Sequence, residues 1–323
     1  MIQLAVPLLL RIDEVLSEQN QAREGVDRMK ATESAGVRVV VCGVLLALAA
    51  RPSIVFAQPA AVAPPASQLA SKAAEVYTAW PFDPNEATRR QAETAKALGM
   101  EKQLLVDLGI RVSIKFVLIP AGKFMMGSPG DQHEVTITKP YYLAAYKVTQ
   151  AQYAQVMGNN PSAAKGKDFP VNNVTWQDAV DFCQKASKAT QKSIHLPTEA
   201  QWENACRAGA NTKFFWGDDE TKLGQYCWYR ENMGGTMHAV GLKKSNAWGL
   251  YDINGLMWEP CRKGDADANP GDGETARNYA LRGATWGSRP PMFVIGVTIP
   301  PIEDRTAGKG LDRCGMRVAM DAE

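Results

Sequence analysis

Histidine, charge of one sign and long apolar runs are all scarce in this chain of 323 residues. The 36 lysines and arginines nearly balance the 34 aspartates and glutamates, which leaves a formal charge of +2. Basic residues form no run long enough for a nucleic-acid footprint, so we expect no nucleic-acid partner. The three histidines, His133, His195 and His238, lie in separate motifs without the spacing of metal ligands, so we expect hydrogen-bonding or surface roles for them.

The main apolar stretch, VRVVVCGVLLALAA at residues 37–50, is too short and too early for a convincing membrane-spanning helix. Charged residues precede it from Met29, and Val55 and Ala57 occupy the small-residue positions of a cleavage site. This order is typical of a secretory signal peptide, here over residues 29–57. A signal anchor that stays in the membrane is the alternative interpretation.

Cleavage there predicts a periplasmic or secreted protein with no stable membrane span. Residues 1–28 would then be a mis-called start or a disordered segment. Residues 58–80 are expected to form a Pro/Ala-rich tether, because they have no periodic apolar face. Residues 81–115 should add a lead-in helix and an edge strand, and residues 116–323 should form the main domain.

Six cysteines are present, and Cys42 would leave with the signal peptide. Export to an oxidising compartment allows disulfides. An odd number then remains, so at least one thiol should be free or paired with another chain. The remaining cysteines are Cys183, Cys206, Cys227, Cys261 and Cys314.

Regular periodicity is confined to the middle of the chain. It predicts helices within residues 84–99, 149–158, 175–190 and 196–210, two strands and a turn within 104–128, and two short strands within 133–149. Thr149 is a candidate N-cap. The helix at 175–190 is the most clearly amphipathic, with one face made of Trp176, Ala179, Val180, Cys183 and Ala186. After Gly209 the chain is rich in Gly, Asn, Asp, Trp and Pro, which indicates long structured loops of the kind that carry function.

Six motifs occur along the chain in this order: FVLIPAGKFMMGS, VTWQDAVDFC, LPTEAQWENACRAG, WGLYDINGLMWE, LRGATW and CGMRV. Together they resemble the sulfatase-modifying factor or formylglycine-generating enzyme family, which has ergothioneine-synthesis and pyoverdine-maturation relatives. The resemblance covers about Phe116 to Val318. It implies an α+β fold, a variant of the C-type lectin fold with a small twisted antiparallel sheet, a few helices and long structured loops.

The resemblance implies the oxidation of a substrate cysteine, but the two cysteines that hold copper in the family are replaced in this chain. Formylglycine-generating enzymes oxidise a substrate cysteine with copper held by two thiolates, which suit Cu(I). Laying the family motif on GATWGSRPPMF puts Ser288 and Phe293 at the two thiolate positions. Neither side chain holds copper as a thiolate does, so we expect no copper site. A serine mechanism would need a base beside Ser288, and the flanking residues offer no histidine or carboxylate.

Calcium and disulfides are also implied by the resemblance. Relatives with structural calcium show Gly-Asn-x-Trp-Glu-Trp where this chain has GLMWEP, so one ligand is lost and Asn254 and Glu259 remain as candidates. Cys183 and Cys206 match positions that are often disulfide-bonded in the family. Their usual partner positions are not cysteine here, so their pairing stays open, and buried free thiols are the alternative.

Glu199 and Glu203 lie four residues apart on one helix face. Two carboxylates so placed could serve acid–base chemistry. The structural interpretation, in which they pair with Arg207 or with buried backbone, is favoured because no group that would perturb their pKa values is visible nearby in the sequence.

These observations favour an exported binding protein of this family whose ligand is an exported protein, a peptide or a glycan. The candidate contacts are Arg282, Trp286, Ser288, Arg289, Met292 and Phe293. Packing inside a loop core is the competing interpretation for Trp286. The alternative function is an enzyme that modifies an exported protein or peptide by a mechanism that does not use a cysteine of the enzyme, similar to the pyoverdine-maturation branch.

Overall fold

The structure is a computed structural model that describes residues 74–263, 279–300 and 313–322. The expected signal peptide, Cys42 and most of the expected tether lie outside the described residues. Within the described ranges, no helix is both long and apolar enough to cross a bilayer.

The four predicted helices are confirmed. The described residues form α2 (Pro84–Leu98), α3 (Gln150–Met157), α4 (Trp176–Thr190), α5 (Glu199–Arg207) and α6 (Leu223–Tyr226), with short 3-10 helices η1 (Glu220–Lys222) and η2 (Pro290–Phe293). Thr149, Thr175 and Thr198 each begin a helix with a capping box, in which the threonine oxygen accepts from the backbone three residues on. Gly99 ends α2 in the left-handed region, at a φ of 66°.

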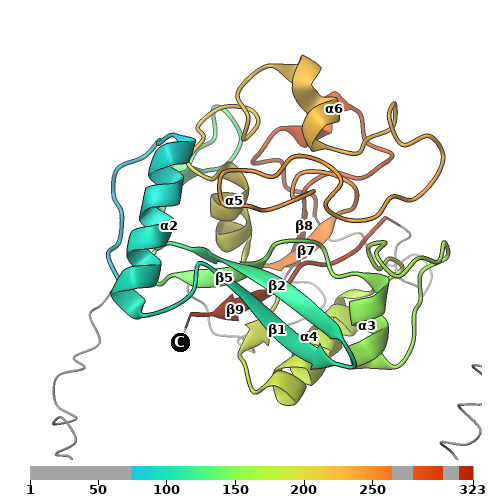
Figure 1. The fold of residues 1–323 in the computed structure, drawn as a ribbon. Coiled ribbons are helices and arrows are strands. Elements are labelled where there is room, and N and C mark those ends of the chain that lie inside the picture. Colours follow the sequence, from blue (N-terminus) through green and yellow to red (C-terminus); the bar gives the residue numbers. More distant parts are fainter. Residues whose placement is uncertain (1–73, 264–278, 301–312, 323) are drawn as a thin grey trace, which may run out of the picture. The chain divides into compact units, whose positions relative to one another are not determined.

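In the described part of the chain, the strands form three antiparallel sheets. Their bounds are β1 (Gln103–Gly109), β2 (Val112–Ile119), β3 (Gly122–Met126), β4 (His133–Ile137), β5 (Tyr141–Ala144), β6 (Ile194–His195), β7 (Glu259–Arg262), β8 (Tyr279–Arg282) and β9 (Ala319–Asp321). The main sheet has the order β1-β2-β5-β9-β6, and β3-β4 and β7-β8 are separate two-stranded sheets. The C-terminal strand β9 thus lies inside the main sheet (Figure 1).

Residues 103–126 hold three strands where the periodicity predicted two. Pro120 and Ala121 end β2, and the chain then leaves the main sheet to pair β3 with β4. The prediction missed β3 because a five-residue strand after a turn has little periodicity of its own.

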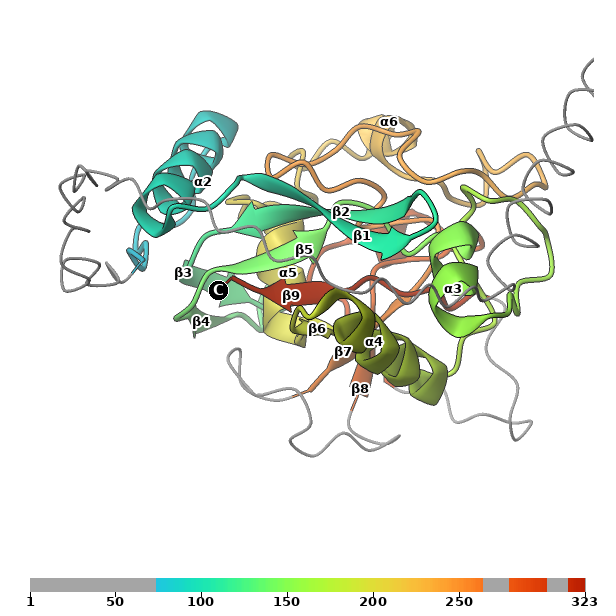
Figure 2. The ribbon, with the colours of Figure 1, turned by 60° about the horizontal axis from the view of Figure 1, so that its bottom comes forward.

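Both faces of the main sheet are buried, which follows from the alternation along β2. Ile114, Phe116 and Leu118 point into a core completed by α3 and α4. Val117 and Ile119 point to the opposite core, which contains residues of α2 and α5. Figure 2 shows α4 beside β6. The predicted apolar face of α4 is buried, as expected.

The lead-in segment is built into the domain. Tyr77 is 6% exposed, its N–H donates to Ala121 O at 3.1 Å, and its carbonyl accepts from Lys123 N–H at 2.8 Å. Tyr77 lies within the residues that were expected to form the tether. It belongs to the folded domain instead, because its backbone N–H and carbonyl bond to the turn between β2 and β3. β1 is the edge strand of the main sheet, as predicted, and β2 begins four residues before the expected boundary at Phe116.

Candidate ligand-binding site

Glu203 of α5 is a buried carboxylate that links α5 to Gly127 after β3 and to β8. Its carboxylate lies 2.6 Å from Arg207 Nη2, accepts from Gly127 N–H at 2.9 Å, and pairs with Arg282 of β8. Burial disfavours the charge of Glu203, but Arg282 and Arg207 outweigh it and lower the pKa of this carboxyl. The structural interpretation of Glu203 is therefore confirmed.

Arg282, predicted as a ligand contact, belongs to this cluster instead. It is 1% exposed, and its Nη1 also lies 3.5 Å from Glu199 Oε1. A guanidinium enclosed between two carboxylates offers no surface to a ligand, so its place in the structure corrects that prediction. The sequence showed the spacing of Glu199 and Glu203 but not the arginine from β8 that they would meet.

Glu259 of β7 forms a second buried ion cluster. Both of its oxygens accept from Arg317, Lys147 Nζ donates to Oε1, and Trp202 Nε1 donates to Oε2 at 2.5 Å. Burial raises the pKa of Glu259, but the charges of Arg317 and Lys147 outweigh it and hold the pKa below its ordinary value. The Lys147 side chain, which follows β5 in the chain, is fully buried beside Glu259.

This cluster does not fit calcium, which corrects the prediction for Asn254 and Glu259. A dication at Glu259 would lie against the ammonium of Lys147 and the guanidinium of Arg317. The Asn254 amide nitrogen meanwhile donates to the carbonyl of Phe293. In the described ranges, no group of three or more His, Cys, Asp or Glu side chains could hold a metal ion.

Ser288 and Phe293, the two positions that the sequence predicted for the family's copper thiolates, serve packing and loop geometry. Ser288 Oγ accepts from Thr285 N–H at 3.0 Å, and the Ser288 carbonyl accepts from Arg230 N–H at 3.3 Å. Phe293 is fully buried in a cluster with Phe214, Leu223 and other apolar residues. These residues do not fit copper, because neither supplies a thiolate and Phe293 has no donor atom. Phe293 is also inaccessible to a ligand.

The thiols of the described residues lie in the interior. Cys206, Cys227, Cys261 and Cys314 are buried and outside any disulfide, and Cys183 lies on the buried face of α4. Burial raises the pKa of Cys206 and of Cys314 to about 12, and raises the pKa values of the other two well above the ordinary thiol value. These four side chains are therefore protonated at neutral pH and suit packing, not nucleophilic or metal chemistry.

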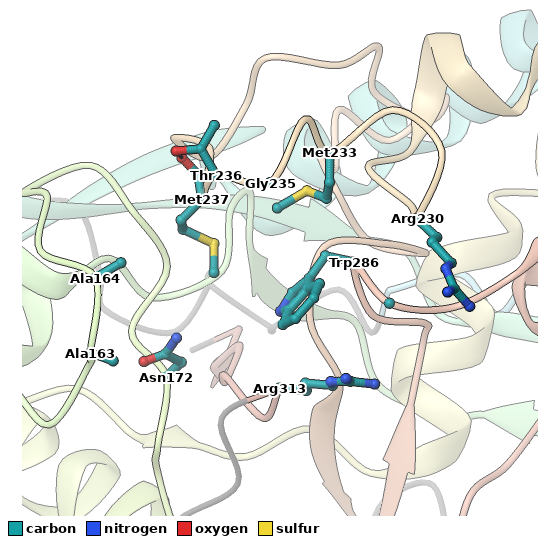
Figure 3. Close-up of a pocket in the computed structure, with 11 residues that line it drawn as sticks. Ala163, Ala164, Asn172, Arg230, Met233, Gly235, Thr236, Met237, Trp286 and Arg313 are labelled. Atoms are coloured by element: carbon teal, nitrogen blue, oxygen red, sulfur yellow. Dashed lines mark hydrogen bonds between the residues drawn. The ribbon is translucent and has the colours of Figure 1, made fainter.

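A pocket of about 550 Å³ opens in the loop region, within the usual range for small-molecule sites. Figure 3 shows Trp286 among the lining residues, with Arg230 to its right, Arg313 below it, and Asn172 and Met237 to its left. The lining residues are Ala163, Ala164, Asn172, Arg230, Met233, Gly235, Thr236, Met237, Trp286, Gly287 and Arg313.

Hydrogen bonds between loops position this pocket. Trp286 N–H donates to Leu256 O at 3.0 Å, which joins the loop after β8 to the loop before β7. Met233 O lies 2.9 Å from His238 Nε2, and the His238 ring stacks on Trp228 at 3.6 Å between centroids. The predicted hydrogen-bonding role of His238 is thereby confirmed.

Of the six predicted contacts, Trp286 alone lines the pocket. Arg289 is exposed and Met292 is half-buried on the neighbouring turn, while Ser288 is turned inward to its own loop. Sequence reasoning missed Asn172, Arg230, Met233, Met237 and Arg313. Arg230, Met233 and Met237 come from the loop between α6 and β7, while Asn172 and Arg313 come from two other loops, and the three loops converge only in the folded chain.

A sequence model of the sulfatase-modifying factor enzyme 1-like domain matches residues 111–322. The chain belongs to the sulfatase-modifying factor family. The match begins in the turn between β1 and β2 and includes the remaining strands. The α+β fold implied by the six motifs is confirmed, with its small antiparallel sheet and long loops.

Proteins similar in sequence to this chain carry different names. The chain is 27% identical over 200 residues to the chaperone protein LppX of Paenibacillus barcinonensis, which covers 46% of this chain and 71% of that protein. It is 31% identical over 140 residues to the formylglycine-generating enzyme of mouse, which covers 39% of this chain but 35% of the enzyme. The chain therefore spans about a third of the length of that enzyme.

Among solved structures, Treponema denticola variable protein 1 is similar to this chain with a TM-score of 0.59. It is 27% identical, and the match covers 69% of this chain and 100% of that protein. Proteins similar to this chain thus have dissimilar names, and the chemistry of its site has to be argued from its own residues.

Proposed function

We propose that this protein is a binding member of the sulfatase-modifying factor family, without copper-dependent formylglycine chemistry. Its pocket beside Trp286 receives the ligand, and Arg289 and Met292 on the neighbouring turn extend the contact surface. The ligand is an exported protein, peptide or glycan, and the protein itself is exported by the signal at residues 29–57. The observation that carries the proposal is that Ser288 and Phe293, which the motif alignment puts at the copper positions, offer no thiolate and are turned to loop geometry and packing.

Three further observations support binding over oxidation. The four thiols with raised pKa values are buried, so none is a candidate nucleophile at neutral pH. The pocket holds methionine, tryptophan and arginine side chains, which are typical of binding surfaces. The similarity to LppX, a protein named as a chaperone, agrees with a role in holding other molecules.

The absence of formylglycine chemistry is tested with the full-length protein, Cu(I) and a peptide that carries a sulfatase cysteine motif. We expect the peptide cysteine to be recovered unchanged by mass spectrometry. Formation of the aldehyde would overturn the proposal, because it would require a copper site that Ser288 and Phe293 do not provide.

Binding is tested by a thermal-shift screen of small molecules and short peptides against the same protein. Compounds that raise the midpoint of unfolding should lose this effect in Trp286→Ala and in Met237→Ala, provided that circular dichroism shows both variants folded. Compounds that stabilise the wild type and both variants equally would place the binding site elsewhere and contradict the proposal.

A further inference from the structure

We infer that two copies of this chain associate through β1, which pairs antiparallel with the same strand of a second copy and joins the two main sheets. The inference does not depend on the proposed function, because none of the described residues that line the pocket belongs to β1. It is carried by an open strand edge, an exposed leucine on that strand, and a register in which the strand is complementary to itself.

β1 has one paired and one open edge in the described part of the chain. It is the first strand in the order β1-β2-β5-β9-β6, with β2 as its neighbour in the sheet (Figure 1). Lys102 O accepts from Leu118 N–H at 2.9 Å. Hydrogen-bonded pairs alternate along an antiparallel ladder, so in this register the backbone groups of Leu104 and Val106 also point to β2.

The open edge is formed by the backbone groups of the alternate residues, Gln103, Leu105 and Asp107, which point away from β2. The opposite side of the ladder agrees with this alternation. Lys115 of β2 lies opposite Leu105, but its carbonyl accepts from Ala145 N–H at 2.8 Å and is therefore turned to the β5 side of β2. An edge of free N–H and C=O groups is a template for another strand.

This open edge is short. The register of β1 with β2 shifts between Asp107 and Gly109. Within this irregularity, Leu108 O accepts from Gln155 Nε2 of α3 at 3.2 Å. A bulge and a helix side chain thus close the end of the strand, and the length that remains for pairing is 103–107.

Apolar exposure is concentrated on the same hairpin. Leu105 is 68% exposed and Ile110, in the turn to β2, is 85% exposed, and Leu242 is the remaining large apolar side chain exposed among the described residues. Leu105 lies at the centre of the open edge, between the exposed side chains of Gln103 and Asp107. A leucine at this place lacks the charge that commonly prevents edge strands from pairing, which favours a partner strand.

The strand is complementary to itself when a twofold axis passes through Leu105. This axis sets Leu105 opposite Leu105 of the second copy, so the two exposed apolar side chains cover each other. It also sets Gln103 opposite Asp107 of the second copy on both sides of the axis, where the amide can donate to the carboxylate. Cross-strand pairs of this kind are what stabilise neighbouring strands.

The neighbouring registers are unfavourable. Moving the axis by one or two residues in either direction sets two carboxylates opposite each other, or sets Leu105 opposite a carboxylate. The carboxylates concerned are those of Glu101 and Asp107. Like charges directly opposite each other are destabilising, so the axis at Leu105 is selected.

The test is sedimentation velocity of the full-length protein at concentrations up to about 100 μM, because a contact made by one strand forms a small, weak interface. We expect a reversible equilibrium between monomer and dimer. Leu105→Lys should weaken dimerisation about tenfold or more, since it sets two ammonium groups opposite each other. Leu242→Lys makes the same exchange at an exposed leucine outside β1 and is the matched control, without effect.

Two variants of Gln103 test the register. Gln103→Lys sets an ammonium opposite Asp107 of the second copy and should tighten dimerisation about threefold to tenfold, because each dimer gains this opposite-charge pair on both sides of the axis. Gln103→Glu sets carboxylates opposite each other and should weaken it by a similar factor. Gln103 is exposed in the monomer, so both variants should keep the circular dichroism spectrum and the urea midpoint of the wild type.

A protein that stays monomeric at the highest concentration would overturn the inference. A dimer that Leu105→Lys leaves intact would overturn it too, since the contact would then lie elsewhere, for example in residues 37–50. The same holds for a dimer on which the two Gln103 variants act in the same direction. None of these results bears on the proposed function, which is tested by copper-dependent aldehyde formation and by ligand binding at Trp286.

Discussion

At the scale of single residues, two buried carboxylates hold the loops that form the pocket. Glu203 joins α5 to β8 and to the β3 end at Gly127. Glu259 joins β7 to Lys147 and to Arg317 before β9. Each carboxylate is surrounded by two cations, so it stays ionised although it is fully buried. The cost of such a cluster is high when one member is removed, because the others remain charged and unpaired.

Replacing Glu203 by glutamine should therefore be strongly destabilising. We expect a loss of about 3–5 kcal/mol in the free energy of unfolding, since Arg207 would stay buried without this counter-ion and Arg282 would keep only the more distant Glu199. Urea denaturation measures this loss. Glu134→Gln is the control, because Glu134 pairs with Lys123 on the surface, and it should cost at most about 1 kcal/mol. Similar losses in both variants would contradict the assigned role of Glu203.

The same residues show how far local sequence reasoning reaches. The spacing of Glu203 and Arg207 predicted their pairing, because residues four apart on a helix are neighbours. Arg282 is 79 residues away from Glu203 and meets it only because β8 packs beside α5. For that reason it was predicted as an exposed contact.

At the scale of elements, the helices are set by local chemistry and the short strands by their partners. Threonine caps begin α3, α4 and α5, and a capping box can be recognised within four residues. β6 and β9 have two and three residues, too few to show an alternating pattern. These two strands form because β9 pairs with β5 on one side and with β6 on the other. Side-chain contacts add to the pairing of β6 with β9.

The junction between β6 and β9 should be sensitive to acid. Asp321 accepts from Ser193 Oγ at 2.5 Å, and its Oδ1 lies 3.2 Å from His195 Nε2. The hydrogen bond with His195 is the main cause that lowers the pKa of Asp321 below its ordinary value of 3.8. A lowered folded pKa means that the stabilising contribution is complete above 3.8 and is lost as the pH falls through the folded pKa.

We expect the difference in unfolding free energy between the wild type and Asp321→Asn to shrink over this interval. Urea denaturation from about pH 5.5 down to about pH 2.5 measures it. Asp131→Asn, at an exposed turn residue, should show no comparable change. A difference that is independent of pH, or one that grows in acid, would rule out this role for Asp321.

At the scale of the molecule, the lead-in segment is part of the fold although the family match starts at residue 111. β1 pairs with β2 over most of its length, and α2 buries Ala87 and Ala95 against the two cores. Gln91 Nε2 also donates to Leu118 O at 2.8 Å. Removing this segment would expose the edge of β2 and apolar surface on both sides of the sheet.

A chain that starts at residue 74 should keep the cooperative unfolding transition of the full protein, whereas a chain that starts at residue 111 should lose it or aggregate. Size-exclusion chromatography followed by urea denaturation separates the two results. Recovery of a soluble chain from residue 111 with unchanged stability would show that the lead-in is dispensable.

The sequence by itself determined the family, the class of fold, the main helices with their caps, and the buried face of α4. These features depend on residues close together in the chain, or on motifs whose order is visible without a structure. The assignment of Ser288 and Phe293 to the copper positions of the family is a prediction from the same motifs.

Only the tertiary structure decided which side chains face a ligand. In the folded chain Arg282 and Phe293 are buried, and Glu259 forms ion pairs with Lys147 and Arg317. The tertiary structure also brought Asn172, Arg313 and the loop that carries Arg230 and Met237 together around Trp286. The physical reason is that loops without periodicity are positioned by long-range hydrogen bonds and buried charges, and the partners in those contacts are far apart in the sequence.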